Sequence, residues 1–183
     1  LLILPLLWLG LRWFERVNLY FPVRAMEGDP GMLGLRFEDL LLPASDGPII
    51  HGWYIENTPG SPVLLVSHGN GGNISHRFDK LHIFRQAGAS VLLFDYRGYG
   101  RSAGRPDEQG TYRDAEAAYR WLVEVKKVPA SRIALYGESL GGAVALELAM
   151  RHKAAGLILD SSFTSVVDMG KRVFPFLPID WMV

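Results

Sequence analysis

The sequence predicts an α/β protein built on a doubly wound, mostly parallel sheet. Short, uninterrupted apolar runs, typical of strands buried on both faces, alternate with segments whose apolar residues recur at helical spacing. Two further strand candidates precede them and are separated by a turn-rich connection that is typical of an antiparallel hairpin. Strand-helix alternation of this kind favours right-handed crossovers and a sheet with helices on both faces.

Each element has its own local signal. Strands are predicted at residues 35–42, 49–56, 63–67, 90–94, 133–136 and 156–160. The first helix follows the apolar spacing from Ile74 to Phe84 and stops at Gly88. A capping-box pattern starting at Thr111 predicts the second helix, which Pro129 closes. The third runs from Ser139 to three cations at 151–153, which suit the negative end of a helix dipole.

Composition removes several classes of function. The chain has 19 basic and 19 acidic residues and no net charge, so nothing favours a nucleic-acid partner. It has no cysteine, which excludes thiol catalysis, disulfides and thiolate metal sites. No motif for an organic cofactor or a metal is present, and none is expected to be needed.

The first 20 residues predict a membrane anchor that is cut at its start. Residues 1–11 carry no charge, and aromatic and basic residues follow them. A span takes about 20 apolar residues, so the anchor is expected to have been longer, in a single-pass membrane protein of unassigned orientation. A cleaved signal peptide and an amphipathic helix packed on the domain are the alternatives. Residues 21–34 are predicted to be a linker, and residues 35–183 a globular domain.

The chain is organised around a predicted turn from strand to helix at Ser139. The segment Gly137-Glu138-Ser139-Leu140-Gly141 has small residues on both sides of the serine, as a strained corner requires. We call residues 137–142 the Ser139 turn. At the first turn of a helix, the Ser139 hydroxyl is expected to lie beside unpaired N–H groups, which favours a nucleophile over a solvated surface serine.

A second glycine-rich segment, residues 68–73, follows the apolar run 63–67. We call it the glycine loop, and its composition is that of an oxyanion-hole element that pairs with a nucleophile turn. On this interpretation the backbone N–H groups of Asn70 and Leu140 face the oxyanion. A plain glycine turn or a phosphate cradle are the alternatives, and the cradle lacks a G-K-[ST] motif. The arginine-rich loop 95–102 is predicted to be structural, bonding to backbone, rather than an anion clamp.

Four linked motifs resemble the α/β-hydrolase superfamily in order and spacing: His68–Asn73, Asp95–Ser102, Gly137–Gly142 and Asp160–Phe163. They are most similar to its membrane-anchored abhydrolase-domain serine hydrolases, which are related to serine aminopeptidase-like and lysophospholipase-like members. The resemblance covers residues 35–183 and implies an incomplete α/β-hydrolase fold with about six of eight strands. It implies Ser139 as nucleophile and the backbone of Asn70 and Leu140 as oxyanion hole.

The sequence departs from that family in the remaining catalytic residues. The family's triad runs Ser, acid, His along the chain, and no histidine follows His152. His68 and Gly69 in the glycine loop, and Asp160 after a neighbouring strand, are possible supporting residues. The expectation is the N-terminal two-thirds of a serine hydrolase that lacks its acid and base and is inactive as this fragment.

The predicted reaction is hydrolysis of an ester, thioester or amide through an acyl-enzyme on Ser139. The apolar segment 163–183 occupies the place of the family's cap and favours a small-molecule, lipid or acylated substrate. The alternative is a membrane-tethered, non-catalytic binding module with the same fold. The sequence does not indicate an oligomeric state.

Overall fold

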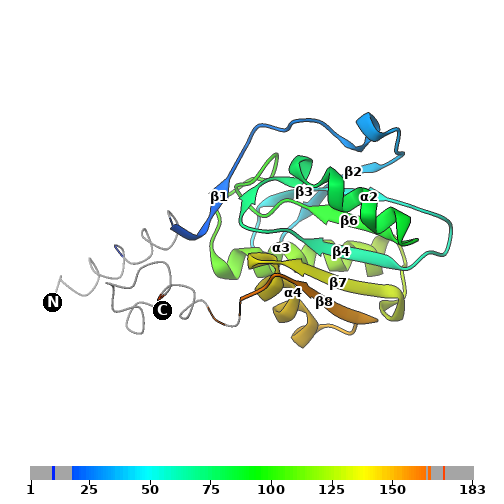
Figure 1. Cartoon of the computed structure of the whole chain (residues 1–183). Helices are drawn as coiled ribbons and strands as arrows, with labels where there is room; N and C mark the ends of the chain where they lie inside the picture. The colour runs from blue at the N-terminus through cyan, green and yellow to red at the C-terminus, as the bar shows by residue number, and fades with distance from the viewer. Residues whose placement is uncertain (1–9, 11–17, 164, 166–170, 172–183) are drawn as a thin grey trace.

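A computed structural model describes residues 10, 18–163, 165 and 171 of the chain. Its centre is a six-stranded sheet in the order β2-β3-β6-β4-β7-β8 (Figure 1). The strands are β2 (Glu38–Pro43), β3 (Ile49–Ile55), β4 (Val63–Ser67), β6 (Ser90–Phe94), β7 (Ile133–Glu138) and β8 (Gly156–Asp160). Strand β3 is antiparallel to both β2 and β6, and the other pairs are parallel. The predicted fold class, including its antiparallel start, is confirmed.

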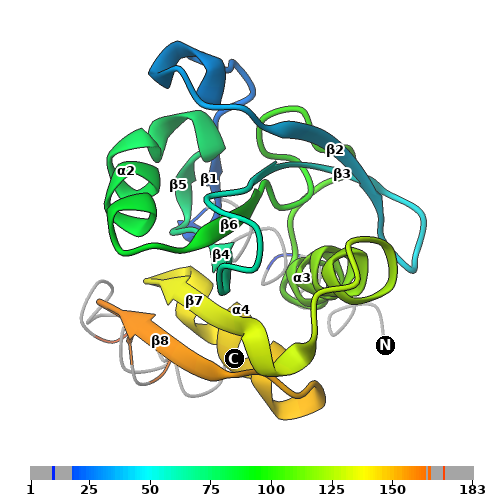
Figure 2. The same cartoon turned by 90° about the vertical axis from the view of Figure 1, so that its right-hand side faces the viewer.

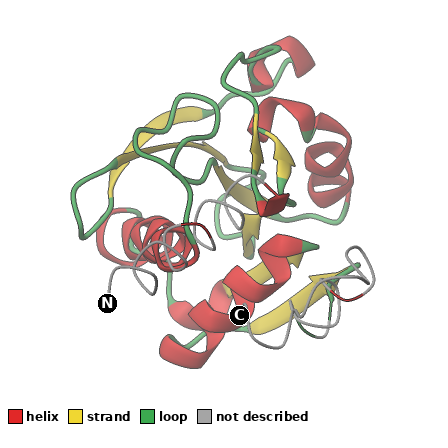
Figure 3. Ribbon diagram, turned by 90° about the vertical axis from the view of Figure 1, so that its left-hand side faces the viewer, coloured by secondary structure: helices red, strands yellow, loops and turns green. Residues whose placement is uncertain are grey.

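Helices cover both faces of the sheet (Figures 2 and 3). Helix α2 (Phe78–Gln86) packs on one face, and α3 (Glu108–Arg120) and α4 (Leu140–Arg151) pack on the other. Helix α3 continues through a π-helical turn, Trp121–Val125. The 3-10 turns Pro30–Leu33, Ile74–His76 and Ala130–Arg132 complete the described helical elements.

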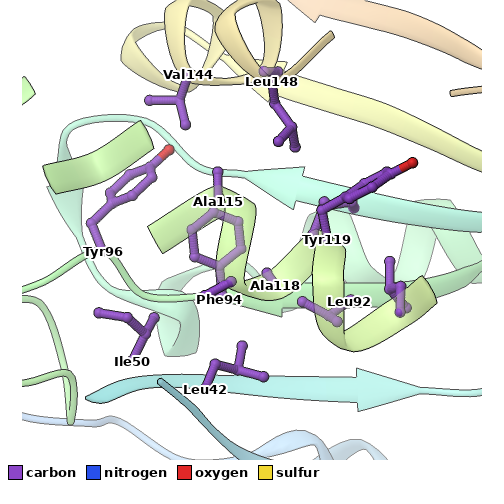
Figure 4. Packing of buried hydrophobic residues seen from close by; sticks show 14 of the residues in the cluster. Leu42, Ile50, Leu92, Phe94, Tyr96, Ala115, Ala118, Tyr119, Val144 and Leu148 are labelled. Carbon is purple, nitrogen blue, oxygen red and sulfur yellow. The ribbon is translucent and has the colours of Figure 1, made fainter. Parts of the chain in front are cut away.

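Two apolar cores hold these layers together, because alternate residues of each central strand point to opposite faces. In β4, Val63 and Leu65 join the core under α3 and α4, whereas Leu64 and Val66 join the core under α2. The larger core packs side chains from the sheet against both helices (Figure 4), among them Leu42, Ile50, Leu92, Phe94, Ala115, Ala118, Val144 and Leu148. Truncating one such buried side chain to alanine typically costs about 2–5 kcal/mol.

Helix α3 starts earlier than its predicted capping box. The cap is Asp107, whose side chain accepts a hydrogen bond from Gly110 N at 2.8 Å. Asp114 does not bond back to Thr111 as the capping box would require. It is fully buried and accepts from Arg97 instead, with Nη2 at 2.8 Å from its Oδ1. A long-range ion pair has therefore overridden the local capping pattern.

That ion pair organises the loop between β6 and α3. Arg97 also donates to both carboxylate oxygens of Asp46, at 2.8 and 2.9 Å. These hydrogen bonds lower the pKa of Asp46 to about 2. Loop 95–102 is structural, as predicted, but Arg97 and Arg101 bond carboxylates rather than backbone. Asp95 does bond backbone and accepts from Ile74 N at 2.9 Å.

The segment before the domain is bound to the glycine loop. Strand β1 (Phe21–Pro22) pairs in parallel with β5 (Gly71–Gly72), and the two lie side by side in Figure 2. The residues around it, 19–27, run across the loops that follow β4 and β6; we call them the N-terminal strap. The predicted linker 21–34 therefore includes a strand paired with the glycine loop.

The prediction of a single-pass membrane location requires correction. Most of the predicted anchor, residues 1–9 and 11–17, lies outside the described residues, as does the predicted N-terminal apolar helix. Within the described part of the chain, no helix is long and apolar enough to cross a membrane. The longest, α3, has 13 residues, five of them charged, whereas a span takes about 20 apolar residues. This finding overturns the predicted location.

Strand β8 forms one edge of the described sheet. It pairs only with β7 in that sheet, and its burial pattern is mixed rather than continuous. Ile158 and Leu159, on opposite faces of the strand, are 47% and 49% exposed. This edge differs from β4 and β6, whose residues are all buried.

Candidate active site

Ser139 occupies a sharp turn between β7 and α4. Its backbone has φ 51° and ψ −115°, a region that residues other than glycine rarely adopt. Two backbone hydrogen bonds hold the turn: Ser139 N donates to Asp160 O, and Gly142 N donates to Ser139 O, both at 2.9 Å. The predicted strand-to-helix corner is present, and strand β8 supports it from the side.

Two glycines permit this turn because backbone packs directly against backbone. A Cβ on Gly137 would lie 2.6 Å from the carbonyl carbon of Gly141. A Cβ on Gly141 would lie 2.5 Å from the carbonyl carbon of Ser67 and 2.7 Å from His68 O. The start of α4 is therefore pressed against the end of β4, where the glycine loop begins.

This packing brings the glycine loop to Ser139. Strands β4 and β7 are parallel neighbours with Ser67 opposite Gly137, so the segments that follow them leave the sheet side by side. A Cβ on Gly69 would lie 3.8 Å from Ser139 Cβ and 3.7 Å from Glu138 O. Gly69 and Ser139, more than sixty residues apart in sequence, are in contact range.

The peptide that carries the Asn70 N–H group is fixed from its other side. His68 Nδ1 donates to Gly69 O at 2.7 Å. In a trans peptide the C=O and the following N–H point in opposite directions, so the Asn70 N–H points away from the His68 ring. Asn70 O in turn accepts from Tyr99 Oη at 2.7 Å and from Phe21 N at 3.1 Å.

Leu140, the other predicted donor, is the first residue of α4 and is buried. The first N–H groups of a helix have no partner within the helix. They also lie at the positive end of the helix dipole. Ser139 thus lies between a helix N-terminus and a glycine loop, an arrangement in which negative charge developing on a substrate oxygen would be stabilised.

A buried histidine-carboxylate cluster lies behind the glycine loop. Asp95 is fully buried between His68 Nε2, 3.5 Å from its Oδ1, and His51 Nδ1, 3.8 Å from its Oδ2. Burial alone would raise the pKa of Asp95, but the two histidines outweigh it and lower that pKa. The His68 ring also packs on Tyr96, with ring centroids 4.5 Å apart. Both ring nitrogens of His68 therefore face groups other than Ser139.

The Asp160 carboxylate is engaged away from the serine. It accepts from Lys80 Nζ at 2.5 Å, from the Tyr136 hydroxyl and from Ser161 Oγ at 2.9 Å. The hydrogen bond from Lys80, followed by those from Tyr136 and Ser161, holds the pKa of Asp160 well below its usual range. Asp160 reaches Ser139 through its backbone carbonyl, not through its side chain.

The other histidines contact groups other than Ser139 or lie on a different part of the surface. His51 Nε2 donates to Asp39 at 2.6 Å, and His76 Nδ1 accepts from Asn73 N at 3.1 Å. His152 faces Glu116 at 3.6 Å past the end of α4, and His82 is exposed on α2. No group of three histidine or carboxylate side chains in the described residues is placed to hold a metal ion.

Sequence reasoning missed the full burial of His51 and its place beside Asp95. The signal available was the position of Asp95 at the carboxyl end of β6, which pairs with β3, the strand that carries His51. It also missed the contact between the N-terminal strap and the glycine loop, for which Pro22 and the glycines gave no periodic signal.

Comparison with known proteins agrees with this architecture. A family profile described as the alpha/beta hydrolase fold matches residues 62–178. An uncharacterized protein of Mycobacterium tuberculosis is 41% identical over 167 residues, covering 90% of this chain and 59% of the relative. The Arabidopsis thaliana alpha/beta hydrolase domain-containing protein WAV2 is 38% identical over 174 residues, covering 90% of this chain and 56% of WAV2. The chain thus spans little more than half of these relatives.

Solved structures give the same assignment. The Pyrococcus furiosus esterase Pf2001 superposes with a TM-score of 0.71 at 26% identity, covering 88% of this chain and 66% of the esterase. An alpha-beta hydrolase from Vibrio vulnificus gives a TM-score of 0.67 at 28% identity, covering 75% of this chain and 50% of that protein. The chain belongs to the α/β-hydrolase fold family.

Proposed function

We propose that the protein is a serine hydrolase that cleaves an ester, thioester or amide through an acyl-enzyme on Ser139. The observation that carries the proposal is the strained backbone of Ser139, φ 51°, next to Gly69 of the glycine loop. Strained backbone clusters at active sites, and in the α/β-hydrolase fold a strained strand-to-helix turn presents the nucleophile. Membership of the α/β-hydrolase fold family and the likeness to an esterase support the hydrolytic class.

In the proposed reaction, Ser139 Oγ attacks the substrate carbonyl carbon while a base removes its proton. The carbonyl oxygen becomes an oxyanion that accepts hydrogen bonds from the N–H groups of Asn70 and Leu140. Loss of one such donor typically costs about 3–4 kcal/mol of transition-state stabilisation. The intermediate then collapses: the leaving group departs with the proton, and water hydrolyses the resulting acyl-enzyme.

The base and the acid are proposed to lie outside the described residues. No described histidine is beside Ser139, because His68 faces Gly69 O and Asp95, and the Asp160 carboxylate is held by Lys80. Without a base, Ser139 keeps only the rate enhancement that comes from the oxyanion hole and from substrate binding. In a well-studied triad enzyme this residual rate is about 10³–10⁴-fold above that of the reaction in water. The 183-residue chain alone is therefore proposed to be inactive.

The proposed substrate is a small ester or an acylated lipid or protein, recognised by its acyl group. The support is compositional: residues 163–183 are rich in Phe and Pro and have the apolar character of a cap. Most of this segment lies outside the described residues. Hydrolysis rates for p-nitrophenyl esters of increasing chain length, measured on the full-length protein, test it directly.

The test of the nucleophile is labelling of the full-length protein with a fluorophosphonate probe. We expect wild type to be labelled and Ser139→Ala to be unlabelled. Ser161→Ala is the matched control, because Ser161 also has a positive φ, 53°, directly after a strand. Labelling that persists in Ser139→Ala refutes the proposal, and a folded, unlabelled wild type favours a non-catalytic binding module.

A further inference from the structure

We propose that the N-terminal strap, residues 19–27, is a positioning element for the oxyanion donor of the glycine loop, and that Asn73 is the residue that joins them. This inference rests on the proposed serine hydrolase function. It assigns a role in that reaction to a segment about fifty residues away in sequence, which does not touch Ser139 in any described contact.

The strap is bonded to the residue that carries the proposed donor. Phe21 N donates to Asn70 O at 3.1 Å, and Asn70 Nδ2 donates to Leu19 O at 3.1 Å. Val23 N donates to Gly72 O at 3.1 Å. The backbone and the side chain of Asn70 are thus both held by the strap. His68 holds the preceding peptide through Gly69 O.

Asn73 ties the strap to the loop with both ends of its amide. Its side chain is fully buried, and Nδ2 donates to Val23 O at 3.0 Å and to Ala25 O at 2.7 Å. Its Oδ1 accepts from Ser75 N at 2.9 Å and from Ser75 Oγ at 2.6 Å. Only a side chain with two donors and an acceptor satisfies this set, so an amide is required here.

The strap also reaches the loop that follows β6. Gly100 N donates to Val23 O at 3.0 Å, and Arg24 Nη1 donates to Ser102 O at 2.5 Å. It therefore bridges two loops at the carboxyl ends of neighbouring strands, β4 and β6, where α/β sheets place their ligands.

Apolar burial anchors the two ends of the strap, and hydrogen bonds hold its middle. Tyr20 is 4% exposed in the larger core, and Met26 packs against the other core. Between them residues 21–25 are exposed, with Phe21 and Val23 at 52% and 41%. A segment with few buried apolar contacts has a low free energy of local opening, so breaking a few of its hydrogen bonds is expected to release residues 21–25 and free Asn70 while the two cores stay intact.

Two variants break the strap contacts from opposite sides. Asn73→Asp keeps the acceptor for Ser75 but turns a carboxylate oxygen toward two carbonyl oxygens, which repels the strap. Phe21→Pro removes the N–H that Asn70 O accepts, and the side chain that it replaces is exposed. The second variant keeps the inference testable if the first does not fold.

Each variant has a matched control. Asn57→Asp makes the same chemical change at the other end of the sheet, where Asn57 Nδ2 donates to Arg85 O at 3.2 Å. Phe21→Ala removes the same ring as Phe21→Pro but keeps the N–H.

The assay is fluorophosphonate labelling of the full-length protein, resolved into the maximal labelling rate constant and the probe concentration for half-maximal rate. We expect Asn73→Asp and Phe21→Pro to lower the maximal rate constant about 10–100-fold, because misplaced donors cost rate. We expect the probe concentration for half-maximal rate to change less than about twofold, because the hydrogen bond from the Asn70 N–H stabilises the transition state rather than the bound probe. Both controls should label like wild type.

Hydrogen exchange at the Val23 amide, which donates to Gly72 O, gives a readout that does not depend on activity. Exchange should be faster in both strap variants than in their controls. Faster exchange with an unchanged labelling rate overturns the positioning role, and unchanged exchange overturns the strap contact itself. A wild type that is unlabelled at Ser139 overturns the proposed function and the role that rests on it. Exchange then still reports whether the strap binds, so the two failures are distinguishable.

Discussion

Replacing Gly141 with alanine is expected to push the Ser139 turn and the glycine loop apart. The added Cβ would lie 2.5 Å from the carbonyl carbon of Ser67, and carbon atoms in contact lie about 3.5 Å apart. The start of α4 or the end of β4 must therefore move by about 1 Å. Neither can yield as a flexible side chain would, because both contacting groups are backbone.

Two opposing effects set the size of the change in stability. Alanine is favoured over glycine within a helix by about 0.8–1.0 kcal/mol. Overpacking typically costs about 1–3 kcal/mol. The unfolding free energy should therefore fall by up to about 2 kcal/mol, and for a chain of this size each kcal/mol lowers Tm by about 2–4 °C.

The effect on catalysis should be much larger than the effect on stability. A displacement of about 1 Å at a reacting centre costs about 10²-fold in rate. The measurement is the fluorophosphonate labelling rate of the full-length protein, with urea denaturation run in parallel.

Gly156→Ala is the control, because a Cβ at Gly156 meets nothing within 4 Å. This variant should have a labelling rate and an unfolding free energy close to those of wild type. If Gly141→Ala labels as fast as Gly156→Ala, the close backbone approach does not position the reacting groups and the reasoning fails.

Three further predictions concern stability. Arg97→Met leaves the buried Asp114 with the backbone N–H of residue 97 but no cationic partner, and should lower the unfolding free energy by about 3–5 kcal/mol in urea denaturation; the exposed Arg113→Met should cost under about 1 kcal/mol. The lowered pKa of Asp46, about 2, means that its contribution to stability is complete above its unfolded pKa of 3.8 and is lost as pH falls through about 2. Solvent screening limits that contribution to about 1 kcal/mol, and acid titration of Asp46→Asn should lack it. Asp107→Ala removes the α3 cap and should lower the unfolding free energy by about 1 kcal/mol; no loss in urea denaturation contradicts the assigned cap.

The central strands were predictable because their signal is local. The bounds of β4 and β6 agree with the predicted runs, since an apolar segment buried on both faces ends where glycine or polar residues begin. The bounds of the edge strand β8 also agree. The start of α3 was not predictable, because Asp114 accepts hydrogen bonds from Arg97, seventeen residues earlier, rather than from the first turn of its own helix. Tertiary pairing of this kind overrides a local capping pattern.

The candidate site also has one part that the sequence predicted and another that it did not. The approach of the glycine loop to the Ser139 turn was predicted from the two motifs, and the parallel pairing of β4 with β7 produces it. The partners of Asn73, Val23 and Ala25, lie about fifty residues earlier, just after a two-residue strand that is too short to show periodicity. The His51–Asp95–His68 cluster likewise joins three strand ends that no local pattern connects.

The half-exposed edge at β8 has a consequence for handling the protein. Among the described residues, β8 has no strand partner on its outer side. An edge strand with exposed apolar side chains recruits strands from other molecules, which leads to aggregation. A preparation limited to these 183 residues should therefore precipitate at high concentration. A lysine in place of Ile158 should keep it in solution, because a charge on an edge strand opposes such recruitment.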